Sequence, residues 1–208
     1  VVLWRRSDEV VPDHTRVLAL DRIVRIAELA LDLERSVAQL RHAATHDPLT
    51  GLAYRARFDD ALGSAPRRRG GFVALLSLDL DGFKPINDEY GHQAGDTVLI
   101  RLAEEVGATV RRNEIFFRVG GDEFAILAPD ADEEEMVGLA RRVGGKIADM
   151  RFVFGGREVQ LTASLGIALY PTHATSSEDI IARADSAMYQ AKLSGKNRWA
   201  VFGSAKLH

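Results

Sequence analysis

The sequence predicts an α+β fold, in which helices pack against a largely antiparallel sheet. After residue 47, segments of helical periodicity and apolar runs of strand length follow in the order α, β, α, β, β, α, β, β, α, β. Two pairs of strand-like runs are separated by glycine-containing turns, which is typical of hairpins, while helices connect the other strands. This mixture of hairpins and crossovers favours an α+β sandwich over a doubly wound parallel sheet.

A heptad repeat marks the N-terminal part of the chain, over residues 13–46. From about Thr15 to Thr45 there is no Pro or Gly, and apolar residues recur at alternating spacings of three and four. β-Branched and leucine side chains at the two repeating positions favour a parallel two-stranded coiled coil. An amphipathic helix lying on its own domain is the alternative. The repeating positions are Ile23, Ile26, Ala30, Leu33, Val37, Leu40 and Ala44.

A new domain is expected to start at Asp47, because the residue before Pro48 is unfavourable in a helix. The segment 55–62 is expected to form a short helix, and 66–71, with three successive arginines, an exposed loop. The apolar run 72–80 has the length of a buried strand and ends among the carboxylates Asp79 and Asp81. This central strand would therefore carry acidic groups at its end.

The rest of the domain is predicted to contain three helices, two hairpins and a short final strand. Helical periodicity covers 96–110, and the runs 115–119 and 124–128 flank a glycine-rich turn. A helix over 132–149 carries acids in its first turn, which suits the helix dipole. Residues 152–168 repeat the hairpin pattern around two glycines. Ser176 or Ser177 can cap a last helix that ends by Gly195, and 199–202 form the final strand.

Composition excludes several classes of protein. With 46% hydrophobic and 27% charged residues, a chain of 208 residues can bury a core without disulfides or a structural metal. A net charge of −3 gives no electrostatic footprint for nucleic acid, and the absence of cysteine excludes thiol catalysis and Cys-based zinc sites. Motifs of serine hydrolases, zinc proteases and phosphate-loop enzymes are missing as well.

The sequence carries no run typical of a membrane span or a signal peptide, and a cytoplasmic location is expected. The chain begins at Val1 rather than Met. We therefore expect it to be a piece of a longer protein, in which a membrane or sensor domain can precede it.

Acidic residues stand at two predicted turns. Asp79 closes the strand of 72–80, and Asp122 lies in the tight turn 120–123. If the two strands are neighbours, these carboxylates lie close together, and like charges so placed need a cation. Mg²⁺ is held by one or two carboxylates together with water and substrate phosphates, so the pattern indicates a nucleotide-phosphate site. The alternative is that both are ordinary turn and capping residues.

Four blocks of sequence support the first interpretation: DPLTGLAYR at 47–55, DLDGFKPINDEYGHQAGD at 79–96, GGDEF at 120–124 and ADSAMYQAKLSGKNR at 184–198. In this order, over 47–202, they resemble the GGDEF domain family, whose active members are diguanylate cyclases. The resemblance implies a five-stranded, mainly antiparallel sheet surrounded by helices, similar to nucleotide cyclases and to the palm of polymerases. The N-terminal helix would precede this domain.

The resemblance also implies a role for each matching residue. Asp79, the backbone carbonyl of Leu80 and Asp122 would hold one or two Mg²⁺ (or Mn²⁺) ions. Glu123 belongs to the same acidic, metal-binding cluster. Asp122 and Glu123 would be catalytic, with Asp122 the best candidate to accept the proton of the attacking hydroxyl. The residues implied in substrate binding are Phe83, Lys84, Asn87, Asp96, Gly120, Gly121, Lys192 and Lys196.

The chemistry of these side chains agrees with the implied substrate. Asn87 and Asp96 would contact guanine, since a carboxylate can accept both N–H donors of its Watson–Crick edge. Lys192 and Lys196 would meet the terminal phosphates as point charges, assisted by Lys84. The two turn glycines would let the backbone lie against the nucleotide. For Phe83, packing in the core is a second interpretation.

The implied activity is that of a diguanylate cyclase, which condenses two GTP molecules into cyclic di-GMP and releases two pyrophosphates. Each domain would hold one GTP, so catalysis needs a homodimer, which the N-terminal helix would bring together. The alternative is a catalytically silent module that binds GTP or cyclic di-GMP and regulates an attached phosphodiesterase or sensor domain. The chain would then comprise a residual upstream segment (1–12), a signalling helix (13–46), the GGDEF domain (47–203) and a tail (204–208).

Two positions depart from the family pattern. The Arg-x-x-Asp motif of an inhibitory site for the product is matched here by Arg111 and Glu114, whose acid is one methylene longer. These residues are a candidate product site of altered geometry, and an exposed ion pair at a helix end is the alternative. Gly82 stands where many members have His, a variant frequent in domains fused to a phosphodiesterase.

Overall fold

The computed structural model describes residues 22, 24–36, 45–64 and 72–204, and the chain divides into two compact units, 1–42 and 43–208. In the first unit, residues 24–36 are helical, and Ile26 and Leu33 of the predicted seam are 67% and 65% exposed. The seam residues Ile23, Val37, Leu40 and Ala44 lie outside the described residues, as do the segments 1–12 and 66–71 and the end of the tail. The structure of a single chain shows no coiled coil in its described part, so the coiled coil stays a prediction.

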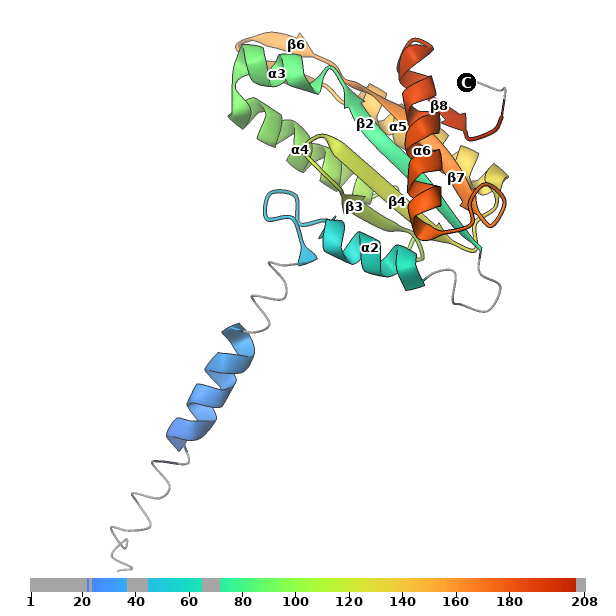
Figure 1. Ribbon diagram of the computed structural model, residues 1–208. Coiled ribbons are helices and arrows are strands. Elements are labelled where there is room, and N and C mark those ends of the chain that lie inside the picture. Colours follow the sequence, from blue (N-terminus) through green and yellow to red (C-terminus); the bar gives the residue numbers. More distant parts are fainter. Residues whose placement is uncertain (1–21, 23, 37–44, 65–71, 205–208) are drawn as a thin grey trace, which may run out of the picture. The chain divides into compact units, whose positions relative to one another are not determined.

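The second unit is built on a mixed sheet. Among the described residues, six strands form this sheet in the order β1-β3-β4-β2-β7-β8 (Figure 1). The central strand β2 runs antiparallel to both β4 and β7, whereas the edge pairs β1–β3 and β7–β8 are parallel. The strands are β1 (Ala53–Tyr54), β2 (Val73–Asp81), β3 (Ile115–Arg118), β4 (Glu123–Pro129), β7 (Thr162–Tyr170) and β8 (Arg198–Val201).

The predictions of five strands and of a long second hairpin are wrong. The additional strand is β1, a two-residue strand with Ala53 opposite Phe117, which is too short to produce an alternating pattern. The strands β5 (Phe152–Phe154) and β6 (Arg157–Val159) do form a hairpin, but it is a separate two-stranded sheet. The run after it, β7, joins the main sheet beside β2, where it is buried on both faces.

Five helices of the second unit lie in its described part: α2 (Arg55–Ser64), α3 (Phe83–Tyr90), α4 (His92–Gly107), α5 (Glu133–Asp149) and α6 (Ser177–Leu193). The predicted cap of α6 is confirmed, because Ser176 Oγ accepts a hydrogen bond of 3.1 Å from the Asp179 amide. α3 was not predicted. It begins after Gly82, whose φ of 83° lies in the left-handed region, so glycine suits this position better than the family's histidine. No helix in the described ranges is long and apolar enough to cross a membrane.

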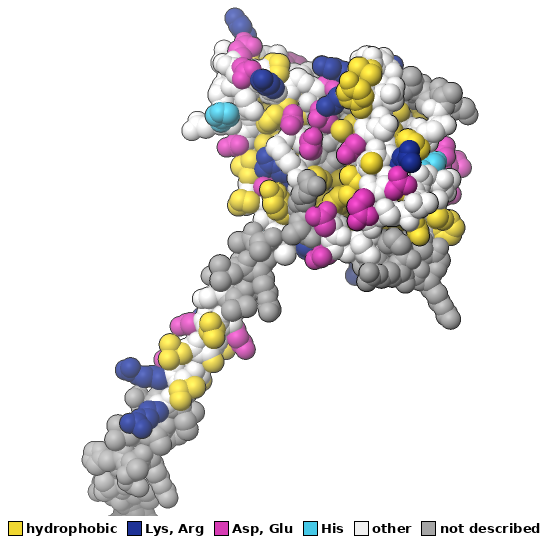
Figure 2. Space-filling model, viewed as in Figure 1, with side chains coloured by type: hydrophobic (Ala, Val, Ile, Leu, Met, Phe, Trp, Pro, Cys, Tyr) yellow, Lys and Arg dark blue, Asp and Glu magenta, His cyan; other side chains and the backbone are white. Residues whose placement is uncertain are grey.

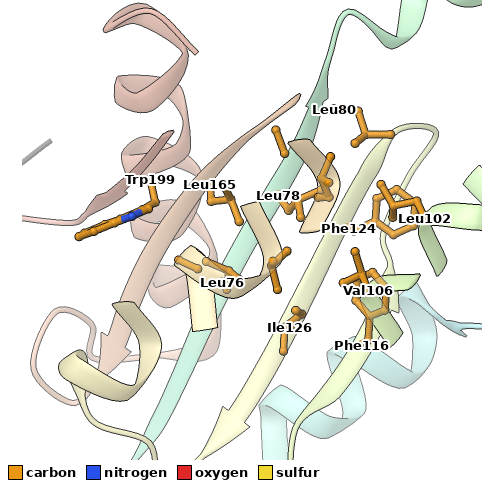
Figure 3. Packing of buried hydrophobic residues seen from close by; sticks show 14 of the residues in the cluster. Leu76, Leu78, Leu80, Leu102, Val106, Phe116, Phe124, Ile126, Leu165 and Trp199 are labelled. Carbon is orange, nitrogen blue, oxygen red and sulfur yellow. The ribbon is translucent and has the colours of Figure 1, made fainter. Parts of the chain in front are cut away.

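The helices cover both faces of the sheet. Leu76, Leu78 and Leu80 of β2 point into the larger core cluster, where residues of α4 and α5 meet them (Figure 3). Val73 and Leu75 lie in a second cluster with residues of α2 and α6. Because side chains alternate along a strand, the carboxylates at positions 79 and 81 belong to the face that α6 covers. The fold thus directs both acids of β2 toward α6.

Gly166 of β7 allows α6 to lie directly on the sheet. A Cβ at this position would overlap the carbonyl oxygen of Ala184 and the backbone nitrogen of Met188, both in α6. The helix therefore packs backbone to backbone against β7, which brings its last turn, with Lys192, down to the end of β2. A flexible side chain could move aside, but the backbone of a packed helix cannot move without a loss of stability.

We expect the substitution Gly166→Ala to destabilise the domain by about 3 kcal/mol, because the added methyl group must displace α6. Gly145→Ala is the matched control: it lies inside α5, where a Cβ meets no atom within 4 Å. The control should stabilise the protein by up to about 1 kcal/mol through helix propensity. Urea denaturation followed by circular dichroism measures both changes. Equal stability of the two variants would contradict the close packing of α6.

Candidate active site

Asp79 lies near the end of β2, opposite Glu123 of β4 and Ser164 of β7. The residue is only 9% exposed, and its Oδ2 lies 2.7 Å from Nζ of Lys192. Burial raises the pKa of Asp79, an effect that Lys192 opposes and that the nearby carboxylates of Asp122 and Asp81 reinforce. A buried carboxylate among other carboxylates needs a positive partner, and here the partner is the Lys192 ammonium.

The turn between β3 and β4 lies beside the end of β2. The Leu80 amide donates a hydrogen bond of 3.4 Å to the backbone oxygen of Asp122, so the structure places the Asp122 turn beside Asp79 and Leu80. Metal binding by these three residues stays a prediction. Glu123 is exposed, and its Oε2 would lie 3.0 Å from a Cβ on Gly120. Beside Gly121, the chain leaves open space where a Cβ would stand.

The predicted ligands suit a magnesium ion bound together with a nucleotide. No three His, Cys, Asp or Glu side chains in the described part of the chain gather into a metal-binding group. Asp79 and Asp122 supply two carboxylates and Leu80 a carbonyl, which is the small set of oxygen donors that Mg²⁺ takes when phosphates complete its shell. Asp79 is ion-paired with Lys192, so positive charge already stabilises its carboxylate.

Arg118 joins this turn to the start of the domain. Its Nε and Nη2 donate to the Gly121 carbonyl at 3.1 and 2.8 Å, and its Nη1 donates to Asp47 Oδ1 at 2.8 Å. The amide and hydroxyl of Thr50 donate to the same oxygen of Asp47 at 2.8 and 2.7 Å. Burial alone would raise the pKa of Asp47, but the hydrogen bonds from Thr50 and Arg118 outweigh it and lower the pKa. The sequence block at 47–55 therefore holds the GGDEF turn at 120–124 in place, through Arg118.

The two residues predicted to contact guanine lie on adjoining helices. Asn87 is in α3 and Asp96 is in α4, and a single residue, Gly91, separates these helices. The side chain of Asn87 lies against Gly95, where a Cβ would overlap its Oδ1. Asp96, the next residue, is exposed. Phe83 is 8% exposed and belongs to the core, so packing explains it, and its contact with substrate stays a prediction.

The predicted phosphate-binding lysines lie near the same end of the sheet. Lys192 is in the last turn of α6, and Lys196 is an exposed residue of the loop that follows. Lys84 is exposed on α3. Figure 2 shows acidic and basic side chains close together on the part of this face where α6 lies. This mixture of charges suits a site for a metal-bound triphosphate.

Asp81 has partners that the sequence analysis missed. It is as buried as Asp79, and its carboxylate accepts hydrogen bonds from the hydroxyls of Thr162 and Ser164 at 2.9 and 2.8 Å and from the Asn197 amide at 3.0 Å. The only signal in the sequence is the two-residue spacing, which places both acids on one face. The partners depend on strand register and on a loop, which the sequence pattern does not give.

At the candidate product site, Arg111 and Glu114 interact with each other and with neighbouring charged residues. Glu114 Oε2 accepts a hydrogen bond of 2.7 Å from the Arg111 amide, and its Oε1 lies 3.8 Å from Arg142. The Arg111 guanidinium faces Glu135 instead, also at 3.8 Å. Both residues line a cavity of about 380 Å³. Product binding there stays a prediction.

Comparison with known families gives the same assignment. The profile described as "Diguanylate cyclase, GGDEF domain" matches residues 44–198. The chain belongs to the GGDEF domain family. The crystal structure of the coiled coil and GGDEF domain of DgcB from Caulobacter crescentus, in complex with c-di-GMP, has a TM-score of 0.82 at 29% identity. It covers 88% of this chain, which in turn covers 98% of that chain.

Curated relatives of this GGDEF domain differ in their activities. The bifunctional diguanylate cyclase/cyclic di-GMP phosphodiesterase MucR of Pseudomonas aeruginosa is 39% identical over 184 residues, 87% of this chain and 27% of MucR. The cyclic di-GMP phosphodiesterase NbdA of the same organism is 34% identical over 181 residues, 86% of this chain and 23% of NbdA. The chain thus spans about a quarter of the length of these relatives.

We expect Asp47→Asn to lower the free energy of unfolding by about 2 kcal/mol at neutral pH, because the bonds from Arg118 and Thr50 lose their ionised acceptor. The pKa of Asp47 is lowered in the folded state, so this contribution is complete above the unfolded pKa and is lost as pH falls through the folded one. The gap between wild type and variant should therefore narrow below about pH 4.

Urea denaturation at a series of pH values measures this gap. Glu158→Gln is the control, because its ion pair with Arg151 is exposed and should contribute little at any pH. A gap that stays constant down to pH values near 2 would contradict the ionised state of Asp47 as the source of the stabilisation.

Proposed function

We propose that this GGDEF domain is an active diguanylate cyclase that condenses two GTP molecules into cyclic di-GMP and two pyrophosphates. The observation that carries the proposal is the meeting of Asp79, the Leu80 backbone and the Asp122 turn at one end of the sheet. Lys192 of α6 reaches the same point. Two acids, a carbonyl and a lysine in this arrangement suit a triphosphate bound with a divalent ion, Mg²⁺ or Mn²⁺.

Different residues would bind different parts of GTP. Asn87 and Asp96 hold guanine, and Lys192 and Lys196, with Lys84 nearby, hold the terminal phosphates. The 3′-oxygen of each GTP attacks the α-phosphorus of the other. The new P–O bond forms as the bond to the β-phosphate bridge breaks and pyrophosphate leaves. Asp122 accepts the proton of the attacking hydroxyl.

The cation and the turn complete the site. When bound at Asp79, Leu80 and Asp122, with Glu123 close by, the ion would neutralise the triphosphate and polarise its α-phosphorus. The open space beside Gly121 lets the turn backbone lie against the nucleotide.

The reaction requires two domains, each with its own GTP. The exposed apolar side chains of the helix over 24–36 support a homodimer through the N-terminal helix, because such side chains gain by burial against a second copy. Linking two domains raises the effective concentration of each for the other, so the helix would favour the productive encounter. We place this reaction in the cytoplasm. Binding of the product, cyclic di-GMP, at Arg111 and Glu114 would inhibit further synthesis.

A GGDEF module without turnover is the second candidate, and the phosphodiesterase NbdA among its relatives favours it. Such a module would bind GTP or cyclic di-GMP and regulate an attached domain. The presence of Asp79, Asp122, Glu123 and both lysines of the last block favours catalysis instead. Measuring GTP binding and cyclic di-GMP formation on the same protein distinguishes an active cyclase from a silent module.

We expect the chain to convert GTP into cyclic di-GMP in the presence of Mg²⁺, as measured by chromatography of the products. Asp122→Asn should lower the rate at least about 100-fold, because it removes a metal ligand and proton acceptor. Asp60→Asn, an exposed position of α2, changes the charge equally and should leave the rate unchanged. Equal rates in both variants would contradict the assignment of Asp122, and tight GTP binding without product would favour the silent module.

We expect Gly95→Ala to weaken binding of GTP at least about tenfold, because the new methyl group must displace the side chain of Asn87. Gly107→Ala, at the other end of α4, meets no atom within 4 Å and is the control. Calorimetric titration with a GTP analogue that carries a methylene group between the α- and β-phosphates measures binding without turnover. Unchanged affinity of the Gly95 variant would argue against Asn87 as a guanine contact.

A further inference from the structure

The two acids of β2 have different kinds of partner. Asp79 is paired with an ammonium group, whereas Asp81 accepts hydrogen bonds from two hydroxyls and a backbone amide. Three donors can stabilise a buried carboxylate without a cation. Thr162 and Ser164 belong to β7, the neighbour of β2, but Asn197 belongs to the loop between α6 and β8. Asp81 therefore holds a loop as well as a strand.

That loop has an unusual backbone conformation. Gly195, Lys196 and Asn197 have φ angles of 118°, 61° and 48°, all in the left-handed region. Lysine rarely adopts this conformation, so the surrounding structure must impose it. The Lys196 amide donates to the Ala191 carbonyl at 3.2 Å, which ties the loop to the end of α6.

The peptide unit between Lys196 and Asn197 is held at both ends. Its carbonyl accepts a hydrogen bond of 3.0 Å from Arg198 Nε, and its N–H donates the bond of 3.0 Å to Asp81 Oδ2. Rotation of this peptide about its neighbouring bonds would break both hydrogen bonds and is therefore disfavoured. The direction in which the Lys196 side chain leaves the backbone is therefore set by Asp81 and Arg198 together.

We infer that Asp81 is a positioning residue for Lys196 and acts through the Asn197 amide. The inference rests on the proposed function, in which Lys196 meets the terminal phosphates of GTP. Asp81 follows Asp79 on the same face of the same strand, so one strand would place both the metal-binding carboxylate and the phosphate-binding lysine. If Asp81 only joined β2 to β7, its loss would affect nucleotide binding regardless of Lys196.

The first experiment tests the tie itself, without any ligand. Amide hydrogen exchange by NMR on the full chain should show exchange of the Asn197 amide at least about tenfold faster in Asp81→Ala than in wild type. Ser164→Ala is the control: it removes a donor to the other oxygen, Oδ1, and leaves the bond to Asn197 in place. Equal exchange of the Asn197 amide in wild type and Asp81→Ala would overturn the inference.

The second experiment is a double-mutant cycle with the methylene analogue of GTP and Mg²⁺. Asp81→Ala and Lys196→Ala should each weaken binding about tenfold, and Asp81→Ala should cost less than about twofold when Lys196 is already alanine. Losses that multiply fully in the double variant would overturn the inference. Asp81→Asn, which keeps an acceptor for the Asn197 amide, should restore most of the affinity and covers the case in which the alanine variant fails to fold.

The two experiments separate this inference from the proposed function. A wild-type protein that does not bind the analogue would overturn both the proposed function and the role of Lys196. Binding by wild type, with unchanged affinity in the Asp81→Ala variant, would overturn only the positioning role of Asp81.

Discussion

The register of β2 between two antiparallel neighbours is the constraint on which the site depends. Asp79 lies opposite Glu123 on one side and Ser164 on the other, and β2 pairs with β4 along seven residues and with β7 along nine. A shift of one residue would turn Asp79 and Asp81 toward the core helices and Leu78 and Leu80 toward α6. The apolar burial of β2 therefore also fixes the position of its acids.

Close packing at two glycines brings other elements of the fold into contact with the site. At Gly166, the backbone of α6 approaches β7 so closely that Lys192 reaches Asp79. At Gly95, the missing Cβ makes room for the side chain of Asn87 beside Asp96. Both effects come from the absence of a side chain, so neither shows as an apolar or charged pattern in the sequence.

Much of the fold was predictable because its main elements bury one face or both. The run 72–80 and the start of α6 were predicted from apolar length and a capping serine. β1 and α3 were missed, since two residues show no period and α3 follows a glycine that resembles a turn. In the site, the strand end at Asp79 and the turn at Asp122 were predicted, but their proximity depends on β2 and β4 being neighbours, which the family resemblance implied and the pattern alone did not. The partners of Asp81 and Arg118 could not be predicted, because they depend on register and on loop backbones.

Loops that carry binding groups lack the hydrogen-bond ladder that holds strands, so side chains must replace it. In this domain one basic and one acidic side chain, Arg118 and Asp81, form these hydrogen bonds. Arg118 donates to the Gly121 carbonyl in the turn before Asp122, and Asp81 accepts from the amide after Lys196. Each acts from a strand of the rigid sheet. The two loops that would meet a nucleotide are thus both held by side chains of the same sheet, which limits how far one can move relative to the other.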